Sequence, residues 1–181
     1  REGWPSVWQV ETDEANATAN QEGIEIPYYD YTQLTPTDAA AGTTWNRNYI
    51  LVNLTNIIVD GVESPGLTTI SAKGKSAISA EAKFFRAYAY NNLATCFGRV
   101  PLVQHALSAP KTDFVRAPLD EVNNFIVNDL LFAAANLPDI EAVKTNSKGK
   151  LYGRANKYMA MQLLAEVYLR MGKNDLAEQQ A

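Results

Sequence analysis

The sequence predicts a mainly α-helical fold of tetratricopeptide-like hairpins, preceded by a long irregular segment. Apolar side chains recur at spacings of three and four residues in several stretches after residue 43, which is typical of amphipathic helices. Gly and Pro separate these stretches, as expected for short connections between helices. The stretch "AEVYLRMGKNDLA" at 165–177 also matches the second helix, turn and next helix of a tetratricopeptide-like repeat.

The chain divides into an irregular segment, residues 1–42, and a helical scaffold, residues 43–181, within one domain. The first segment is rich in Thr, Asn, Ala, Pro and Tyr without a strong period, and we expect only a short helix near residues 4–10. Thr43 and Thr44 are a plausible N-cap for the next helix, which should end near residues 60–61. The spacings of three and four among Trp45, Tyr49, Val52, Asn53, Asn56 and Ile57 predict this helix.

The next predicted helix covers the stretch 79–97 and should be buried on more than one side. Its apolar positions are Phe84, Phe85, Tyr88, Ala89, Leu93, Cys96 and Phe97. Gly98 stands where a left-handed C-cap residue belongs, and Pro101 follows as a stop. Charged groups on a packed helix need partners, so we expect Glu81 and Arg86 each to have a polar or charged partner. Glu81, near the expected start of the helix, would also complement the helix dipole.

Two further helices are predicted, and a third begins at the end of the chain. Pro118 suits the first turn of a helix that extends to Pro138, and Val122, Phe125, Ile126, Leu130, Ala133 and Leu137 form its apolar face. After a polar loop, a helix from about Arg154 to Met171 should end at Gly172, with Asn174 capping the next. Because that last helix stops short and the chain opens without Met, we expect the N-terminal portion of a longer protein.

Composition excludes several classes of function. The net charge of −4 argues against nucleic acid as a partner, and no apolar run approaches the roughly 20 residues of a membrane span. Cys96 and His105 are the only cysteine and histidine, so a disulfide framework, a multi-histidine metal site and a Ser-His-Asp triad are not expected. We therefore predict no cofactor, no metal ligand and no catalytic residue.

Four stretches, in this order, resemble the N-terminal half of the SusD/RagB family. They are "TDEA" at 12–15, "WNRNYILVNLTNII" at 45–58, "AEAKFFRAYAYNNLATCFGRVPLV" at 80–103 and "GRANKYMAMQLLAEVYLRMGK" at 153–173. The most specific part is the helix that carries Glu-Ala, Phe, Arg-Ala-Tyr and Leu, followed by Gly-x-Val-Pro-Leu-Val. The resemblance extends from about residue 11 to the end of the chain.

This resemblance implies a non-enzymatic nutrient-binding lipoprotein at the outer-membrane surface of Bacteroidota-type bacteria. Such proteins bind oligosaccharides, or in some members peptides, and cover a TonB-dependent, SusC-like transporter barrel to which they deliver the ligand. A lipidated cysteine anchors them. Cys96 lies within a predicted helix, so the implied anchor would lie upstream of Arg1.

The candidate glycan site lies in the irregular segment. Tyr28, Tyr29, Asp30, Tyr31 and Gln33 follow one another closely, and aromatic faces with polar neighbours suit sugar rings. The resemblance adds Asp13, which falls in the "TDE" block. It also puts starch in doubt, since the starch-binding prototype uses tryptophans and an arginine there. The alternative is that the tyrosines pack the segment onto the helices or form a short strand.

Two other functions are alternatives to glycan binding. A tetratricopeptide-type adaptor, or a peptide-binding member of the same family, would hold a peptide on the helical scaffold. A glycosidase would need a pair of opposed carboxylates, and Glu11, Asp13 and Glu14 offer no evident partner acid. The sequence favours glycan binding over both.

Overall fold

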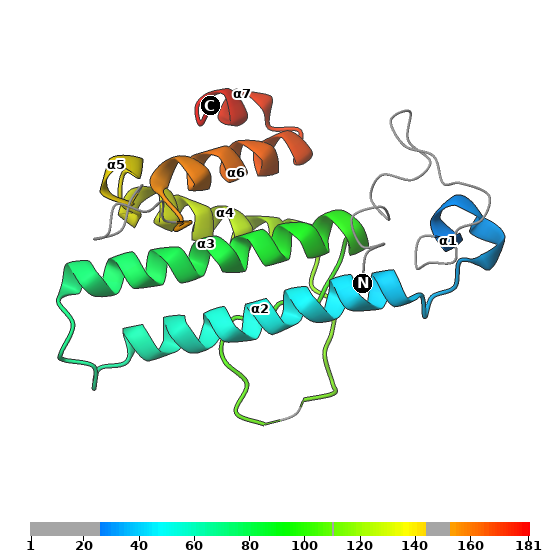
Figure 1. Cartoon of the computed structure of the whole chain (residues 1–181), viewed down its shortest axis with the longest axis horizontal. Helices are drawn as coiled ribbons and strands as arrows, with labels where there is room; N and C mark the ends of the chain where they lie inside the picture. The colour runs from blue at the N-terminus through cyan, green and yellow to red at the C-terminus, as the bar shows by residue number, and fades with distance from the viewer. Residues whose placement is uncertain (1–25, 110, 144–152) are drawn as a thin grey trace. The chain divides into compact units, whose positions relative to one another are not determined.

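The computed structural model describes residues 26–109, 111–143 and 153–181, and these fall into two compact units, 1–47 and 48–181. Every regular element in the described ranges is helical, which confirms the predicted fold class (Figure 1). None of these helices is long and apolar enough to cross a membrane. The elements are α1 (Ile26–Tyr29), the 3-10 helix η2 (Tyr31–Gln33), α2 (Ala39–Glu63), α3 (Ala72–Phe97), α4 (Leu119–Asn136), α5 (Ile140–Val143), α6 (Lys157–Arg170) and α7 (Asn174–Glu178).

In the first unit, the tyrosine-rich segment forms short helical turns rather than a strand. It leads into α2, which begins at Ala39, four residues before the predicted Thr43 cap. Asp38 explains the earlier start, because its Oδ1 accepts hydrogen bonds from the N–H groups of Ala40 (2.9 Å) and Ala41 (3.4 Å). A carboxylate at this position satisfies N–H groups of the first turn that have no partner inside the helix.

In the second unit, α2 and α3 form an antiparallel hairpin, side by side in Figure 1. Asn48 Oδ1 accepts from Asn92 Nδ2 at 3.3 Å near one end of the pair. Glu63 Oε1 accepts from Lys83 Nζ at 3.1 Å near the other end. Residue numbers therefore rise along α2 from 48 to 63 while those of their partners on α3 fall from 92 to 83, as in an antiparallel pair.

Helix α3 is the central helix of this unit, as its wide apolar surface predicts. It packs against α4 and α6 and is linked to α2 by side-chain hydrogen bonds, and its large fully buried side chains include Tyr90 and Leu93. The prediction is wrong at two of the apolar positions expected to be buried, because Tyr88 and Cys96 are exposed. Small residues at Ala80, Ala87 and Ala89, each with no exposed surface, instead allow the close approach of neighbouring helices.

The start of α3 also differs from the prediction. Ser71 caps the helix through its Oγ, which accepts from Gly74 N at 3.2 Å. Because the helix begins at Ala72, Glu81 lies well inside it and cannot complement the positive end of the dipole. Glu81 instead forms an ion pair with Arg154 from the segment before α6.

Helices α4, α6 and α7 continue the hairpin stack along the chain. The predicted apolar face of α4 is confirmed at Val122, Ile126, Leu130 and Ala133, which have no exposed surface. Helix α6 ends in a Schellman motif, in which Gly172 at φ 72° donates to Leu169 O and Lys173 N donates to Tyr168 O, both at 2.9 Å. Asn174, predicted as a cap, is the first residue of α7 and makes no side-chain cap.

A buried arginine links α3 to three other parts of the unit. The Arg86 and Asp129 side chains are 5% and 7% exposed. Arg86 Nε and Nη2 donate to the two carboxylate oxygens of Asp129 on α4, at 2.7 and 2.9 Å. Nη1 donates to Asn56 Oδ1 on α2 (2.8 Å) and to Gln104 O after α3 (3.2 Å). The guanidinium also lies over the Phe125 ring, 4.7 Å from its centroid.

The segment that follows α3 is held by side chains instead of by a neighbouring strand. Tyr49 Oη donates to Pro101 O at 2.8 Å, and Asn56 Nδ2 donates to Val103 O at 2.9 Å. The Tyr90 hydroxyl accepts from Val103 N at 2.7 Å, so both backbone groups of Val103 are bonded. Partly buried backbone groups need such partners. The path of the chain after Gly98 is therefore fixed by residues of α2 and α3.

We predict that Arg86→Met destabilises the protein by about 3–5 kcal/mol near neutral pH, because it leaves the Asp129 carboxylate buried without its partner. Burial already raises the pKa of Asp129, against the opposing effect of Arg86, and the pKa should rise further in the variant. The folded variant then binds a proton at higher pH than the unfolded chain does. Its unfolding free energy should therefore recover as the pH falls from about 7 to about 5.

Urea unfolding at both pH values measures this effect, and the wild type corrects for other groups. Adding Asp129→Leu to Arg86→Met should restore part of the lost stability at neutral pH, since no unpaired charge remains. A deficit that is independent of pH and unchanged in the double variant would contradict this account of the pair.

Two glycine-to-alanine substitutions should have opposite effects on stability. Gly98 caps α3 at φ 66° and ψ −112°, so its φ is positive as predicted, although ψ differs from that of a left-handed helical residue. Gly98→Ala should cost about 1–2 kcal/mol from backbone strain alone, since a Cβ there meets nothing within 4 Å. Gly61, within α2, is equally open, and Gly61→Ala should stabilise by up to about 1 kcal/mol. Thermal unfolding of the two variants measures both effects. Equal shifts of the melting temperature would contradict the conclusion that only Gly98 needs a positive φ.

Candidate functional site

Tyr28 of the predicted glycan site has a structural partner within the first unit. Its hydroxyl donates to Asp38 Oδ1 at 2.6 Å, the same oxygen that caps α2. Burial opposes ionisation of Asp38, but this hydrogen bond and those from the backbone lower its pKa on balance. Tyr28 therefore supports the start of the helix, as the packing alternative expected.

Asp30 organises the turn that presents Tyr31. Its Oδ1 accepts from the Thr32 hydroxyl at 2.5 Å and from Thr32 N at 3.2 Å, while Oδ2 accepts from Gln33 Nε2 at 2.5 Å. The hydrogen bonds from Thr32 and Gln33 lower the pKa of Asp30, so it is an anion at neutral pH. The Tyr31 side chain is 64% exposed next to this carboxylate. An exposed ring beside an acceptor is an arrangement suited to a sugar.

The structure therefore brings together some of the predicted site residues, whereas others lie outside the described part of the chain. Tyr28, Tyr31 and Gln33 lie in one short stretch of helical turns. Asp13 and the Tyr29 side chain lie outside what the structure describes. Whether these residues bind a ligand stays a prediction. Asp30, one of the polar residues predicted beside the tyrosines, is the residue that holds the turn together.

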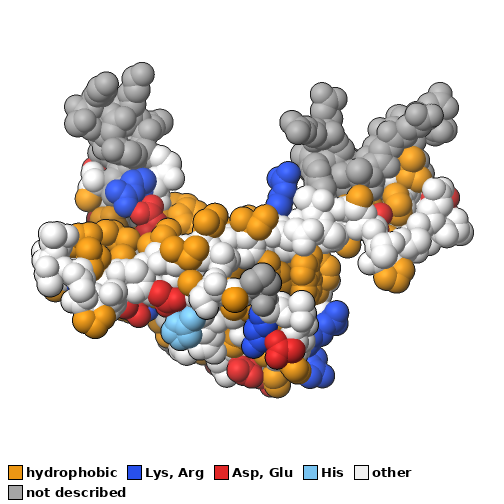
Figure 2. All heavy atoms as spheres, turned by 90° about the horizontal axis from the view of Figure 1, so that it is seen from below, with side chains coloured by type: hydrophobic (Ala, Val, Ile, Leu, Met, Phe, Trp, Pro, Cys, Tyr) orange, Lys and Arg blue, Asp and Glu red, His pale blue; other side chains and the backbone are white. Residues whose placement is uncertain are grey.

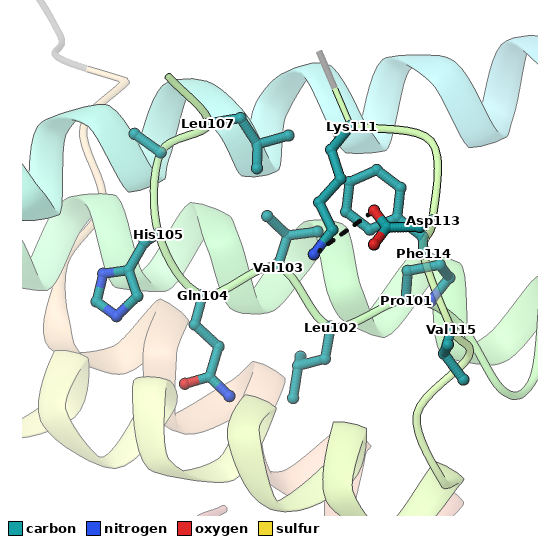
Figure 3. Close-up of a pocket in the computed structure, with 11 residues that line it drawn as sticks. Pro101, Leu102, Val103, Gln104, His105, Leu107, Lys111, Asp113, Phe114 and Val115 are labelled. Carbon is teal, nitrogen blue, oxygen red and sulfur yellow. Dashed lines mark ion pairs between the residues drawn. The ribbon is translucent and has the colours of Figure 1, made fainter. Parts of the chain in front are cut away.

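The loop between α3 and α4 contains a cavity that the sequence analysis did not anticipate. Residues 101 and 116 form an isolated antiparallel bridge, and Ala117 N donates to Val100 O at 2.9 Å, so the loop is closed at its base. A cavity of about 390 Å³ opens inside it (Figure 3). It is lined by Pro101, Leu102, Val103, Gln104, His105, Ala106, Leu107, Lys111, Asp113, Phe114 and Val115.

Polar groups of this loop lie among apolar ones. In Figure 3, Lys111 points toward Asp113 in front of the Phe114 ring, and the His105 ring lies apart from them. Lys111 Nζ is 3.9 Å from Asp113 Oδ1 and 5.4 Å from the ring centroid of Phe114. Seen from below, as in Figure 2, charged and histidine side chains lie among hydrophobic ones on the face toward which the loop projects.

His105, expected at the surface, is 81% exposed in its side chain and bonds to α2. Its Nδ1 lies 2.9 Å from Asp60 Oδ1, and Asp60 Oδ2 accepts from Ala106 N at 2.8 Å. Burial opposes ionisation of Asp60, yet the Ala106 N–H and the His105 ring lower its pKa on balance. This pair fastens the loop to the helix. The spacing of Asn53, Asn56 and Asp60 on α2 was the available signal, since polar residues on an inner helix face need partners.

Comparison with known proteins places the fold and the motifs in one family. Residues 6–169 match the family model SusD-like_3, described as starch-binding and associating with the outer membrane. A SusD-like protein of Bacteroides ovatus is 31% identical over 153 residues, which cover 82% of this chain and 26% of the relative. The chain thus spans about a quarter of that relative's length.

Two solved structures are similar to the chain in fold as well as sequence. A laminarin-binding SusD-like protein is 28% identical with a TM-score of 0.71, covering 85% of this chain and 31% of that one. A crystal structure with xylogluco-oligosaccharide is also 28% identical, with a TM-score of 0.70 and the same shares covered. The match to the family model over most of the chain shows that the chain belongs to the SusD-like family.

Proposed function

We propose that the protein is a non-enzymatic carbohydrate-binding protein of the bacterial cell surface, which captures an oligosaccharide for uptake. The observation that carries this proposal is the match of residues 6–169 to a family described as starch-binding. Likeness to a laminarin-binding protein and to a structure with xylogluco-oligosaccharide supports a glycan ligand. Both of those glycans are built from neutral sugars, so neutral oligosaccharides are the ligands to test first.

The proposed site on the first unit centres on Tyr31, with Asp30 and Gln33 beside it. An exposed aromatic ring can pack on the C–H face of a sugar, and the neighbouring carboxylate can accept hydrogen bonds from hydroxyl groups. Asp13 and Tyr29 are included in the proposed site on the basis of the sequence alone. Tyr28 contributes indirectly, through Asp38 and the start of α2.

Absence of catalysis is part of the proposal. Glycoside hydrolysis by the usual route needs two carboxyl groups at a defined separation. Asp30 is hydrogen-bonded to Thr32 and Gln33 within its own turn, which suits a structural and ligand-contacting carboxylate. Release of reducing sugar from laminarin or xyloglucan by the purified protein would contradict this part.

Delivery to a TonB-dependent, SusC-like transporter and attachment to the outer membrane by a lipid anchor upstream of Arg1 are also proposed. Both rest on membership of a family described as associating with the outer membrane. Co-purification of the protein with such a transporter, from a cell that carries both, is the direct test.

An adaptor that binds a peptide is the alternative, and one observation favours it. Helix α2 exposes an apolar row at Ile50, Leu54, Ile57 and Ile58, whose side chains are 60%, 53%, 51% and 43% exposed. The spacing places the row on one face, which would suit an amphipathic helical peptide. Under this alternative, Ile57→Asn would abolish peptide binding and glycans would not bind.

We predict that Tyr31→Ala weakens binding of laminarin- or xyloglucan-derived oligosaccharides roughly three- to tenfold, from the loss of one aromatic contact. Calorimetric titration gives the dissociation constant. Because the ring is exposed, the variant should keep the helical circular-dichroism signal and the thermal stability of the wild type.

Tyr28→Phe is the matched control, since it removes a hydroxyl and keeps a ring. It should lower stability by about 0.5–1.5 kcal/mol through the lost bond to Asp38, with little change in the affinity of the folded protein. Unchanged affinity in Tyr31→Ala would remove this residue from the site. Binding of none of these glycans by the wild type would overturn the proposed function itself.

A further inference from the structure

One wall of the cavity in the loop between α3 and α4 is held in place by residues outside the loop. On one wall, Val103 is bonded through both backbone groups, to Tyr90 and Asn56. Ala106 N donates to Asp60 Oδ2 at 2.8 Å, and Gln104 O accepts from the buried Arg86. The bridge between residues 101 and 116 closes the base. This wall and the base are therefore in place before any ligand arrives, which reduces the entropic cost of binding.

The size and lining of the cavity limit what it can hold. At about 390 Å³, it is near the lower end of the usual range for small-molecule sites, roughly 300–1,000 Å³. That space suits one or two sugar rings rather than a folded peptide segment. Phe114, which is 40% exposed, and Leu107, which is 44% exposed, supply apolar surface. Asp113, Lys111 and Gln104 supply acceptors and donors for hydroxyl groups.

The charges of the cavity are balanced within it. Lys111 and Asp113 carry opposite charges 3.9 Å apart at their nearest atoms. The remaining ionisable lining residue, His105, bonds to Asp60 of α2, which lies outside the cavity lining. Neither sign is in excess, so the lining offers no net attraction to a carboxylate or sulfate ester. A neutral ligand with many hydroxyl groups matches this lining better than an anionic one.

We propose that this loop cavity is a binding subsite for a neutral hexopyranose unit of the captured glycan, with Phe114 as the apolar contact and Asp113 and Lys111 as hydroxyl partners. The inference rests on the proposed glycan-binding function and adds to it a site within the helical scaffold unit. Because the cavity opens to the surface, the rest of an oligosaccharide can extend beyond the bound ring.

The test is a nuclear magnetic resonance titration of the purified chain with a laminarin-derived oligosaccharide. A xyloglucan-derived oligosaccharide serves as a second neutral probe and an alginate-derived one as the anionic comparison. We expect amide signals of residues 102–107 and 111–115 to shift with both neutral probes. Phe114→Ala and Asp113→Asn should each raise the dissociation constant roughly three- to tenfold. Tyr88→Ala is the control, because Tyr88 is similarly exposed, at 46%, and does not line the cavity.

The outcomes separate this inference from the proposed function. If the wild type binds a neutral probe and Tyr31→Ala weakens binding, while the loop signals stay fixed and both loop variants bind normally, only the subsite inference is overturned. A loop that responds to the alginate-derived probe alone would also overturn it, since the cavity would then select anions. If no neutral glycan binds the wild type, the proposed function and the subsite inference both fail.

Discussion

The second unit depends on one buried charge, the guanidinium of Arg86. A charge with so little exposure is tolerated only when its donors are satisfied, and here α2, α4 and the segment after α3 each provide an acceptor. Satisfying all of them at once requires one register between these elements. The raised pKa of Asp129 indicates that burial of the pair is costly. The ion pair is therefore better understood as specifying the arrangement than as adding stability.

That arrangement carries through to the loop between α3 and α4. Asn56 accepts from Arg86 with its Oδ1 and donates with its Nδ2 to Val103 O and His105 O, so one amide couples the charge to the loop backbone. Tyr90, whose pKa burial raises to about 12, holds the same segment from α3. The conformation of the cavity wall is thus set by side chains that do not themselves line the cavity.

The sequence predicts the helices well because the patterns that indicate a helix are periodic and local. The apolar face of α4, the turn at Gly172 and the need for a partner at Arg86 all follow from spacing and residue chemistry. The start of α2 was missed because Asp38 and Thr43 are both good caps, and Tyr28 decides between them through a tertiary hydrogen bond. The loop cavity was missed for a related reason. Residues 101–107 are held by hydrogen bonds to α2 and α3, and they line the cavity together with residues 111–115, a juxtaposition that no local pattern encodes.

A division between buried scaffold residues and the exposed residues proposed to contact the ligand would let one fold serve several glycans. Arg86, Asp129, Asn56 and Tyr90 bond to one another or to backbone, whereas Tyr31 in the first unit and Phe114 in the second are exposed on short segments outside the long helices. Exchanging an exposed ring of this kind leaves the buried hydrogen bonds intact, so ligand preference can change at little cost in stability. The relatives fit this view, since proteins about 28% identical to this chain keep its fold with TM-scores near 0.7 and are associated with different glycans. Under the proposed function, the choice of sugar should therefore depend on Tyr31, Phe114 and their polar neighbours, and mutations within the Arg86 network should alter stability before they alter specificity.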